Sequence, residues 1–291
     1  MLYVSMISLL TWNILHYEFV KEEGKKEQRE ERWGNICNFI FTRDYDLVGL
    51  QEVCELFAVY LRQYIKKRRL PYDVYYAGTD TSNPADIHEG FYKPNDCWNE
   101  RMYKYGNLSI VNTSTIKSHE TLFSPFDGPT NSNHSNAVIT TFERDGRLVV
   151  WANTHLVYSN DQFDRLQQLS VIHHNIGVLG KRDTLIFSGD FNNSSVGDLE
   201  IFFPEKIDSA LQQFTKTFAT SAGSPPIGRN YWNISYDNIF FTGMNLMTVL
   251  LGSELNTESE VLRCCDPYPC LSVTCKKGET SDHYPLYVEL I

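Results

Sequence analysis

The sequence predicts an α/β fold, a four-layer sandwich in which two mixed β-sheets pack face to face with helices on their outer sides. Short apolar or alternating segments, typical of strands, dominate the chain. Two amphipathic helices interrupt them, and each falls between two strands, so both halves of the chain repeat a strand, helix and strand order. An Asp-Gly turn at residues 145–146 indicates a hairpin in the second half.

The predicted strands are bounded by polar and turn-forming residues. In chain order they cover residues 5–15, 46–53, 72–78, 107–112, 137–143, 148–155, 184–189, 236–242 and 284–291. The first helix has Trp33 and Ile36 on its apolar face, and the second has Phe163, Leu169 and Ile176. Because each helix has an apolar face, we expect each to cover a sheet.

We expect a single domain over residues 1–291, since the only candidate linker, residues 221–228, is short. The apolar start, residues 1–10, is about half as long as a membrane span and lacks the pattern of a signal peptide. Seven cysteines without such a signal favour reduced thiols, although zinc at residues 264–275 is an alternative. The expected protein is therefore intracellular, cytoplasmic or nuclear, and a monomer without stable membrane insertion.

The acidic charge balance limits the class of function. A formal net charge of -10 argues against a protein that holds nucleic acid by a broad basic face, because such affinity comes from neutralised phosphates. A cluster of carboxylates that holds a cation also makes a chain acidic. The charge therefore fits a metal-using enzyme that contacts a polyanion locally.

Polar residues stand where the predicted strands end, and such side chains would form one polar floor suited to Mg²⁺, with Mn²⁺ as an alternative. Each has an ordinary explanation too. Asn13 could end a strand, Glu52 could cap a helix, His155 could be a buried histidine, and Asp190 with Asn192 could form an Asx-turn. Their conjunction favours a metal-assisted site. In chain order the positions are Asn13, Glu52, His155, Asp190, Asn192, Asp237, Asp282 and His283.

Seven segments around these positions resemble the endonuclease/exonuclease/phosphatase superfamily, and they follow that family's order. They are TWNIL (residues 11–15), DLVGLQEV (46–53), YGNLSIV (105–111), NTHL (153–156), SGDFN (188–192), SYDNIFFT (235–242) and SDHYPLYVEL (281–290). The combination of GDFN and SDH with LQEV upstream is specific, whereas each motif alone is weak. The resemblance implies the sandwich fold and a metal-dependent phosphoric ester hydrolase.

The same resemblance implies a metal site. Glu52 resembles the principal carboxylate ligand, with Asn13 beside it and Asp282 near the ion. A single Mg²⁺ there would supply charge to a phosphate ester during hydrolysis.

Catalytic roles follow from the resemblance in the same way. Asp190 and Asn192 resemble the pair that orients the attacking water and a phosphate oxygen, and Asp190 can take the proton from water. His283 resembles the histidine that contacts the scissile phosphate, with Asp237 as its carboxylate partner. His155 resembles the second histidine of the deoxyribonuclease and sphingomyelinase branches.

Two segments rich in aromatic and basic side chains favour a nucleic-acid strand as the substrate, because bases stack on aromatic rings. The alternative is a loop packed by its own aromatic residues. The basic run at residues 66–69 is expected to end a helix, where the helix dipole favours it. The predicted substrate-binding residues are Trp98, Arg101, Tyr103, Tyr105, Asn107, Arg229, Tyr231 and Trp232.

The expected function is hydrolysis of a nucleic-acid phosphate ester by metal-assisted attack of water. The enzyme would be a Mg²⁺-dependent phosphodiesterase, such as a nuclease, a deadenylase-like enzyme or a 5′-tyrosyl-DNA phosphodiesterase-like enzyme. One alternative is a sphingomyelinase or an inositol phosphate phosphatase of the same fold. A second is a non-catalytic binding relative.

Overall fold

Two mixed β-sheets form the centre of the computed structural model, which describes residues 6–14, 26–78, 105–126, 136–157, 162–192, 196–210, 237–251 and 285–291. The first sheet has the strand order β11-β12-β1-β2-β4-β3, with β1 (Ile7–Asn13), β2 (Leu47–Cys54), β3 (Tyr72–Gly78), β4 (Tyr105–Asn112), β11 (Leu246–Leu251) and β12 (Leu286–Leu290). The second has the order β5-β6-β7-β8-β10-β9, with β5 (His119–Pro125), β6 (Asn136–Arg144), β7 (Arg147–His155), β8 (Thr184–Asp190), β9 (Asp208–Ser209) and β10 (Asp237–Phe241).

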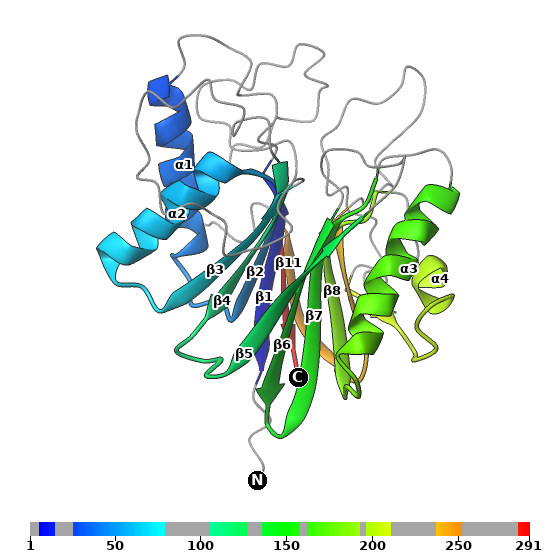
Figure 1. Ribbon diagram of the computed structural model, residues 1–291. Helices are drawn as coiled ribbons and strands as arrows, with labels where there is room; N and C mark the ends of the chain where they lie inside the picture. Colours follow the sequence, from blue (N-terminus) through cyan, green and yellow to red (C-terminus); the bar gives the residue numbers. More distant parts are fainter. Residues whose placement is uncertain are drawn as a thin grey trace.

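Each sheet contains a parallel pair whose strands are consecutive along the chain. The pair β1 and β2 is joined through α1 (Lys26–Ile40), and the pair β7 and β8 is joined through α3 (Gln162–Val178). A parallel connection must cross over one face of its sheet, so both helices lie outside. With α2 (Glu55–Arg68) and α4 (Val196–Glu200) they cover the two outer faces (Figure 1). The predicted four-layer sandwich is confirmed.

Apolar side chains fill the three spaces between the four layers of the sandwich. One cluster, which includes Trp12 and Trp33, lies between the first sheet and α1 and α2. A second, which includes Phe187, lies beneath α3. The third, which includes Leu9 and Trp151, lies between the sheets. Strands covered on both faces are almost continuously apolar, which explains their clear signal in the sequence. In the described part of the chain, no helix is long and apolar enough to cross a membrane.

The structure adds three strands and one short helix to those predicted. The strands β5 and β11 lie at sheet edges, β9 has two residues, and α4 has five. The strand β5 mixes half-buried and exposed residues, so neither a continuous apolar run nor a strict alternation marks it. The basic run at residues 66–69 does end a helix, since Arg69 is the left-handed C-cap of α2.

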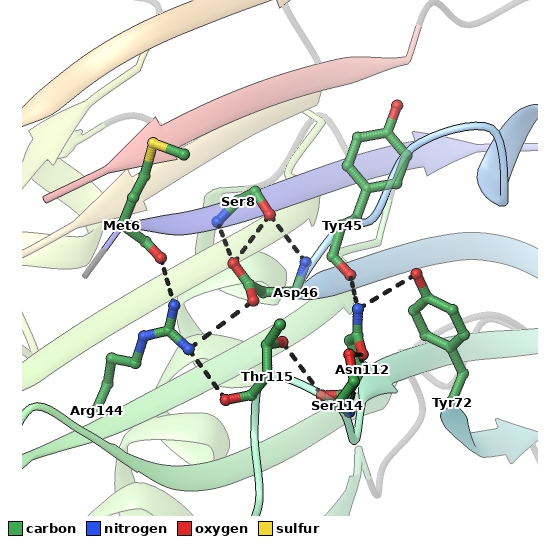
Figure 2. Close-up of polar contacts among 9 residues, drawn as sticks. All are labelled: Met6, Ser8, Tyr45, Asp46, Tyr72, Asn112, Ser114, Thr115 and Arg144. Carbon is green, nitrogen blue, oxygen red and sulfur yellow. Dashed lines mark hydrogen bonds and ion pairs between the residues drawn. The ribbon is translucent and has the colours of Figure 1, made fainter. Parts of the chain in front are cut away.

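A polar cluster joins the sheets at the end of the sandwich where β1 begins (Figure 2). We call Ser8, Asp46 and Arg144 the base cluster. The Asp46 carboxylate accepts hydrogen bonds from the Ser8 amide at 2.8 Å and the Ser8 hydroxyl at 2.9 Å. Arg144, at the end of β6 in the other sheet, lies 3.9 Å from that carboxylate and donates to the carbonyls of Met6 and Thr115 at 2.8 and 3.1 Å. The cluster thus pairs an acid of one sheet with a base of the other.

Candidate active site

Three polar side chains meet where β1, β2 and β8 end or bend, opposite the base cluster. The Asn13 amide nitrogen donates to Glu52 Oε1 at 3.1 Å and to Asp190 Oδ2 at 3.1 Å. We call this contact the Asn13 bridge. Asn13 and Glu52 belong to the first sheet and Asp190 to the second, so one buried amide holds carboxylates of both sheets. The structure therefore brings together three residues that were predicted to share a site.

Glu52 reaches the bridge because β2 has a bulge. The register between β2 and β4 changes from Leu50 opposite Leu108 to Val53 opposite Gly106, so Gln51 and Glu52 together face Asn107. A bulge of this kind changes the direction of a side chain. Glu52 has a φ of 55°, a left-handed conformation that costs about 1–2 kcal/mol for a residue with a side chain. The surrounding contacts must offset this strain.

His155 lies beside Asp190 because β7 and β8 run in parallel and end together. The two residues are register partners, and His155 Nε2 is 3.6 Å from Asp190 Oδ2. Gly189 makes this approach possible, since a Cβ on it would lie 1.8 Å from the Thr154 carbonyl oxygen and its φ is 142°. Only glycine avoids both the clash and the strain here. The structure thus places this histidine beside the acid, and its catalytic role stays a prediction.

An Asx-turn follows β8, as the ordinary interpretation of the sequence predicted. Asp190 Oδ1 accepts a hydrogen bond from the Asn192 amide at 2.9 Å, and Asn192 has a φ of 51°. The Asn192 side chain donates to the Leu156 carbonyl at 2.6 Å. One Asp190 oxygen therefore fixes the turn, while the other faces Asn13 and His155. The proposed roles of Asp190 and Asn192 in orienting water and phosphate stay predictions.

Asp237 places another carboxylate next to Asp190. It begins β10, which pairs with β8 in antiparallel orientation, and Asp237 is the register partner of Asp190. Its side chain is fully buried. The histidine that it was predicted to orient, His283, lies outside the described residues, so that pairing stays a prediction.

Most predicted substrate-binding residues lie outside the described part of the chain. These are Trp98, Arg101, Tyr103, Arg229, Tyr231 and Trp232, together with the predicted metal ligand Asp282. Tyr105 is the first residue of β4, and its substrate contact stays a prediction. Asn107 is fully buried and donates to the Asn136 carbonyl and side-chain oxygens at 2.7 and 2.9 Å. Its predicted contact with substrate is likewise untested.

Two residues next to predicted ones were not assigned a role from the sequence. The Gln51 amide donates to the Thr11 hydroxyl at 3.1 Å and to Asn153 Oδ1 at 2.7 Å. Gln51 precedes Glu52, and Asn153 lies two residues before His155 on the opposite sheet. Their polarity at strand ends was the available signal. Their contact spans 102 residues of sequence, which no local pattern indicates.

Comparisons with known proteins divide sharply between sequence and structure. No protein-family model matches the chain, and a search of curated proteins finds no relative. Among solved structures, TDP2 of D. rerio complexed with a single-strand DNA product is 18% identical, with a TM-score of 0.62 and coverage of 99% of both chains. The human Nocturnin catalytic domain with bound sulfate is 18% identical, with a TM-score of 0.61 and coverage of 98% of this chain and 93% of that one.

A third solved structure carries the name of the fold. The endonuclease/exonuclease/phosphatase from Bacteroides vulgatus is 17% identical, with a TM-score of 0.63 and coverage of 99% of both chains. The chain has the endonuclease/exonuclease/phosphatase fold. At this level of identity the likeness concerns the fold, so the chemistry of an endonuclease/exonuclease/phosphatase protein must be argued from the residues of this chain.

The donor atoms of the Asn13 bridge fit a hard cation. Glu52 and Asp190 provide carboxylate oxygens, a ligand type that Mg²⁺ prefers. Asn13 faces them with its amide nitrogen, so its amide would have to turn for its oxygen to bind a cation. Among the residues that the structure describes, no three His, Cys, Asp or Glu side chains form a metal-binding group. The bridge therefore contains the described part of the predicted ligand set, and Asp282 is its predicted complement.

Proposed function

We propose that this protein is a member of the endonuclease/exonuclease/phosphatase superfamily and a Mg²⁺-dependent phosphodiesterase that hydrolyses a nucleic-acid phosphate ester. The Asn13 bridge carries the proposal, because it gathers two carboxylates from separate sheets at one edge of the sandwich. Two neighbouring carboxylates repel each other, and such pairs are typical of sites that bind a cation or transfer a proton. Mn²⁺ has the same preference for oxygen ligands and would replace Mg²⁺.

The residues of the chain divide the proposed chemistry between them. Asp190 takes a proton from the attacking water. Two hydrogen bonds fix its orientation, one from the main-chain N–H of Asn192 at 2.9 Å and one from the side-chain amide of Asn13 at 3.1 Å. His155, 3.6 Å from Asp190, donates a hydrogen bond to the phosphate or takes over the proton. Glu52 and Asn13 would hold the metal ion. When bound, Mg²⁺ supplies positive charge to the phosphate oxygens.

A nucleic-acid strand is the proposed substrate for two reasons. The TDP2 structure contains a single-strand DNA product, and the Nocturnin structure contains a bound sulfate anion, so two proteins of this fold hold a nucleic acid or a tetrahedral anion. The chain itself has aromatic and basic residues at 98–105 and 229–232, which are suited to stacking on bases and to contacting phosphates. The net charge of -10 favours such local contacts over a basic surface.

The proposal is tested with a substrate panel in the presence of Mg²⁺ and after its removal with EDTA. The panel contains labelled single-stranded DNA, poly(A), 5′-tyrosyl DNA, sphingomyelin and bis-p-nitrophenyl phosphate. We expect EDTA-sensitive cleavage of at least one nucleic-acid substrate, abolished by Glu52→Gln. The matched control is Glu205→Gln, which removes one carboxylate from a surface pair with Arg182 at 2.8 Å and should retain wild-type turnover.

Three outcomes would contradict the proposal in different ways. Turnover of sphingomyelin without cleavage of any oligonucleotide would replace the substrate class and leave the metal site in place. Absence of specific Mg²⁺ binding in calorimetry would indicate a binding protein of the same fold. Cleavage that persists in Glu52→Gln at limiting Mg²⁺ would show that the metal is held elsewhere.

A further inference from the structure

Asn153 crosses the interior of the sandwich to contact the opposite sheet. It lies on β7 in the second sheet and is fully buried. Its amide nitrogen donates to the main-chain carbonyls of Leu50 at 3.3 Å and Leu108 at 3.0 Å, and its oxygen accepts from Gln51 at 2.7 Å. The second sheet is therefore bonded directly to two strands of the first, immediately beneath the site.

The carbonyls that Asn153 contacts border the β2 bulge. Leu50 and Leu108 form the last regular pair of β2 and β4 before the register changes. A bulge interrupts the ladder of hydrogen bonds, and buried main-chain groups are stable only when they have partners. Asn153 supplies partners on both strands and also fixes Gln51, which is half of the bulge. The other half is Glu52, whose left-handed φ of 55° needs such support.

Gly49 provides the space that Asn153 occupies. A Cβ on Gly49 would lie 2.6 Å from Asn153 Oδ1 and 3.0 Å from the Ser188 hydroxyl oxygen. Ser188 is the register partner of Asn153, and its hydroxyl accepts a hydrogen bond from Trp151 at 2.9 Å. The backbone of Gly49 is that of an ordinary strand, so glycine is needed here only for space. That space is filled by the amide of Asn153 from the other sheet.

We propose that Asn153 is a positioning residue that acts through the β2 bulge to hold the Glu52 carboxylate against Asn13. Its side-chain hydrogen bonds in the described structure go to Gln51 and to the main chain of the strands on either side of the bulge. Its effect on the site is therefore indirect. The inference rests on the proposed function, since a cation at the Asn13 bridge is what the correctly aimed carboxylate would bind.

The test compares Asn153→Leu with the matched variant Asn112→Leu. Asn112 is also buried, and its amide nitrogen contacts the Tyr45 carbonyl at 3.2 Å and the Tyr72 hydroxyl at 3.4 Å, near the base cluster. Three quantities are measured on folded protein: amide hydrogen exchange in residues 50–54, Mn²⁺ affinity by electron paramagnetic resonance, and kcat/KM on bis-p-nitrophenyl phosphate. Asn153→Leu should accelerate the exchange and weaken Mn²⁺ affinity and kcat/KM by about 10- to 100-fold each. Asn112→Leu should lower Tm and leave all three unchanged.

A second pair of variants tests the same idea without altering the amide. Gly49→Ala should displace Asn153 and reproduce the faster exchange at residues 50–54 and the weaker Mn²⁺ binding. Its control is Gly177→Ala, where a Cβ on α3 would meet nothing within 4 Å. This pair keeps the test decisive if Asn153→Leu does not fold.

The outcomes separate this inference from the proposed function. Equal changes in Mn²⁺ affinity and exchange for Asn153→Leu and Asn112→Leu would overturn the inference, because Asn153 would then be a structural residue only. In another outcome the wild type binds Mn²⁺ without cleaving any ester of the panel. If Asn153→Leu then weakens that binding, the result would support the inference and contradict the proposed function. A wild-type protein that binds no Mn²⁺ would overturn both.

Discussion

At both ends of the sandwich polar side chains tie one sheet to the other, and the groups that do so differ. The base cluster matches opposite charges, since Asp46 faces Arg144 and also accepts two hydrogen bonds from Ser8 (Figure 2). Buried charges become tolerable when each has a partner of opposite sign and its hydrogen bonds are made. This end is suited to stabilise the fold.

The site end gathers charges of one sign. Glu52 and Asp190 share the Asn13 amide, and Asp237 is the register partner of Asp190. Like charges raise the free energy of the folded state, and strain at Glu52, with its φ of 55°, adds to it. The base cluster thus contributes stability, while the site end stores unfavourable interactions that a cation and a phosphate would relieve. Substitutions at the two ends should therefore have opposite signatures.

The largest effect is expected at the site end. Glu52→Gln removes one of the clustered charges, so we expect kcat/KM to fall about 1,000-fold, or ~4 kcal/mol, while the free energy of unfolding is unchanged or rises. Steady-state kinetics and urea unfolding measure the two quantities. A variant that loses stability in proportion to its activity would erase the distinction between the ends.

At the base cluster we expect the larger effect on stability and the smaller effect on activity. Asp46→Ala leaves the Ser8 hydrogen-bond donors and Arg144 without the carboxylate, so we expect the free energy of unfolding to fall by about 2–3 kcal/mol. The kcat/KM of the folded protein should stay within about twofold of the wild type, since well-separated sites act independently. Urea unfolding and kinetics below the transition check both values, and loss of activity without loss of stability would contradict the assignment.

A smaller effect is expected from the coupling between His155 and Asp190 in the candidate site. His155→Ala and Asp190→Asn should lose less activity together than the sum of their separate losses, because His155 Nε2 lies 3.6 Å from Asp190 Oδ2 and the proposed mechanism couples them. The expected coupling is about 1–2 kcal/mol. A double-mutant cycle on kcat/KM measures it, and strictly additive losses would show that the two side chains act separately.

The smallest effect is expected at alkaline pH, at the end of the sandwich that holds the base cluster. Burial raises the pKa of Tyr45 to about 12, and burial followed by the nearby Asp44 and Asp46 raises the pKa of Tyr72 to about 12. The stabilising contribution of a raised pKa is complete below the unfolded value of 10.0 and is lost as pH rises through the folded value. We expect the urea midpoint to fall between pH 10 and 12, and to fall less steeply in Tyr72→Phe. Identical slopes would contradict this account of Tyr72.

Much of the fold could be predicted because the central strands are covered on both faces. In β1 and β8 every residue is buried, so composition alone marks them. The edge strand β5 contains His119, Glu120 and Pro125 and alternates poorly, since solvent covers part of it. The exposure of β5 is therefore what limited its prediction, whereas β3, also at an edge but mostly buried, has the predicted bounds.

The residues of the candidate site could be predicted one by one, and their geometry could not. Asn13, Glu52 and Asp190 could be found as polar ends of apolar strands. The bulge that aims Glu52 depends on a register shift against β4, and the Asn153 amide that borders it comes from the other sheet. Both depend on contacts between distant segments, so they have no signature in any local stretch of sequence.

The position of β12 has a consequence for the order in which the molecule can assemble during synthesis. The first strand in the chain, β1, lies between β2 and β12, with Ile7 opposite Leu290. The strands β5 to β10 of the second sheet are all translated before residue 242, so that sheet can form while the ribosome is still at work. On its β12 side, β1 must wait as an open edge, and open apolar edges invite pairing with other chains. Until residue 290 has been added, β1 therefore has only β2 as a neighbour in its sheet.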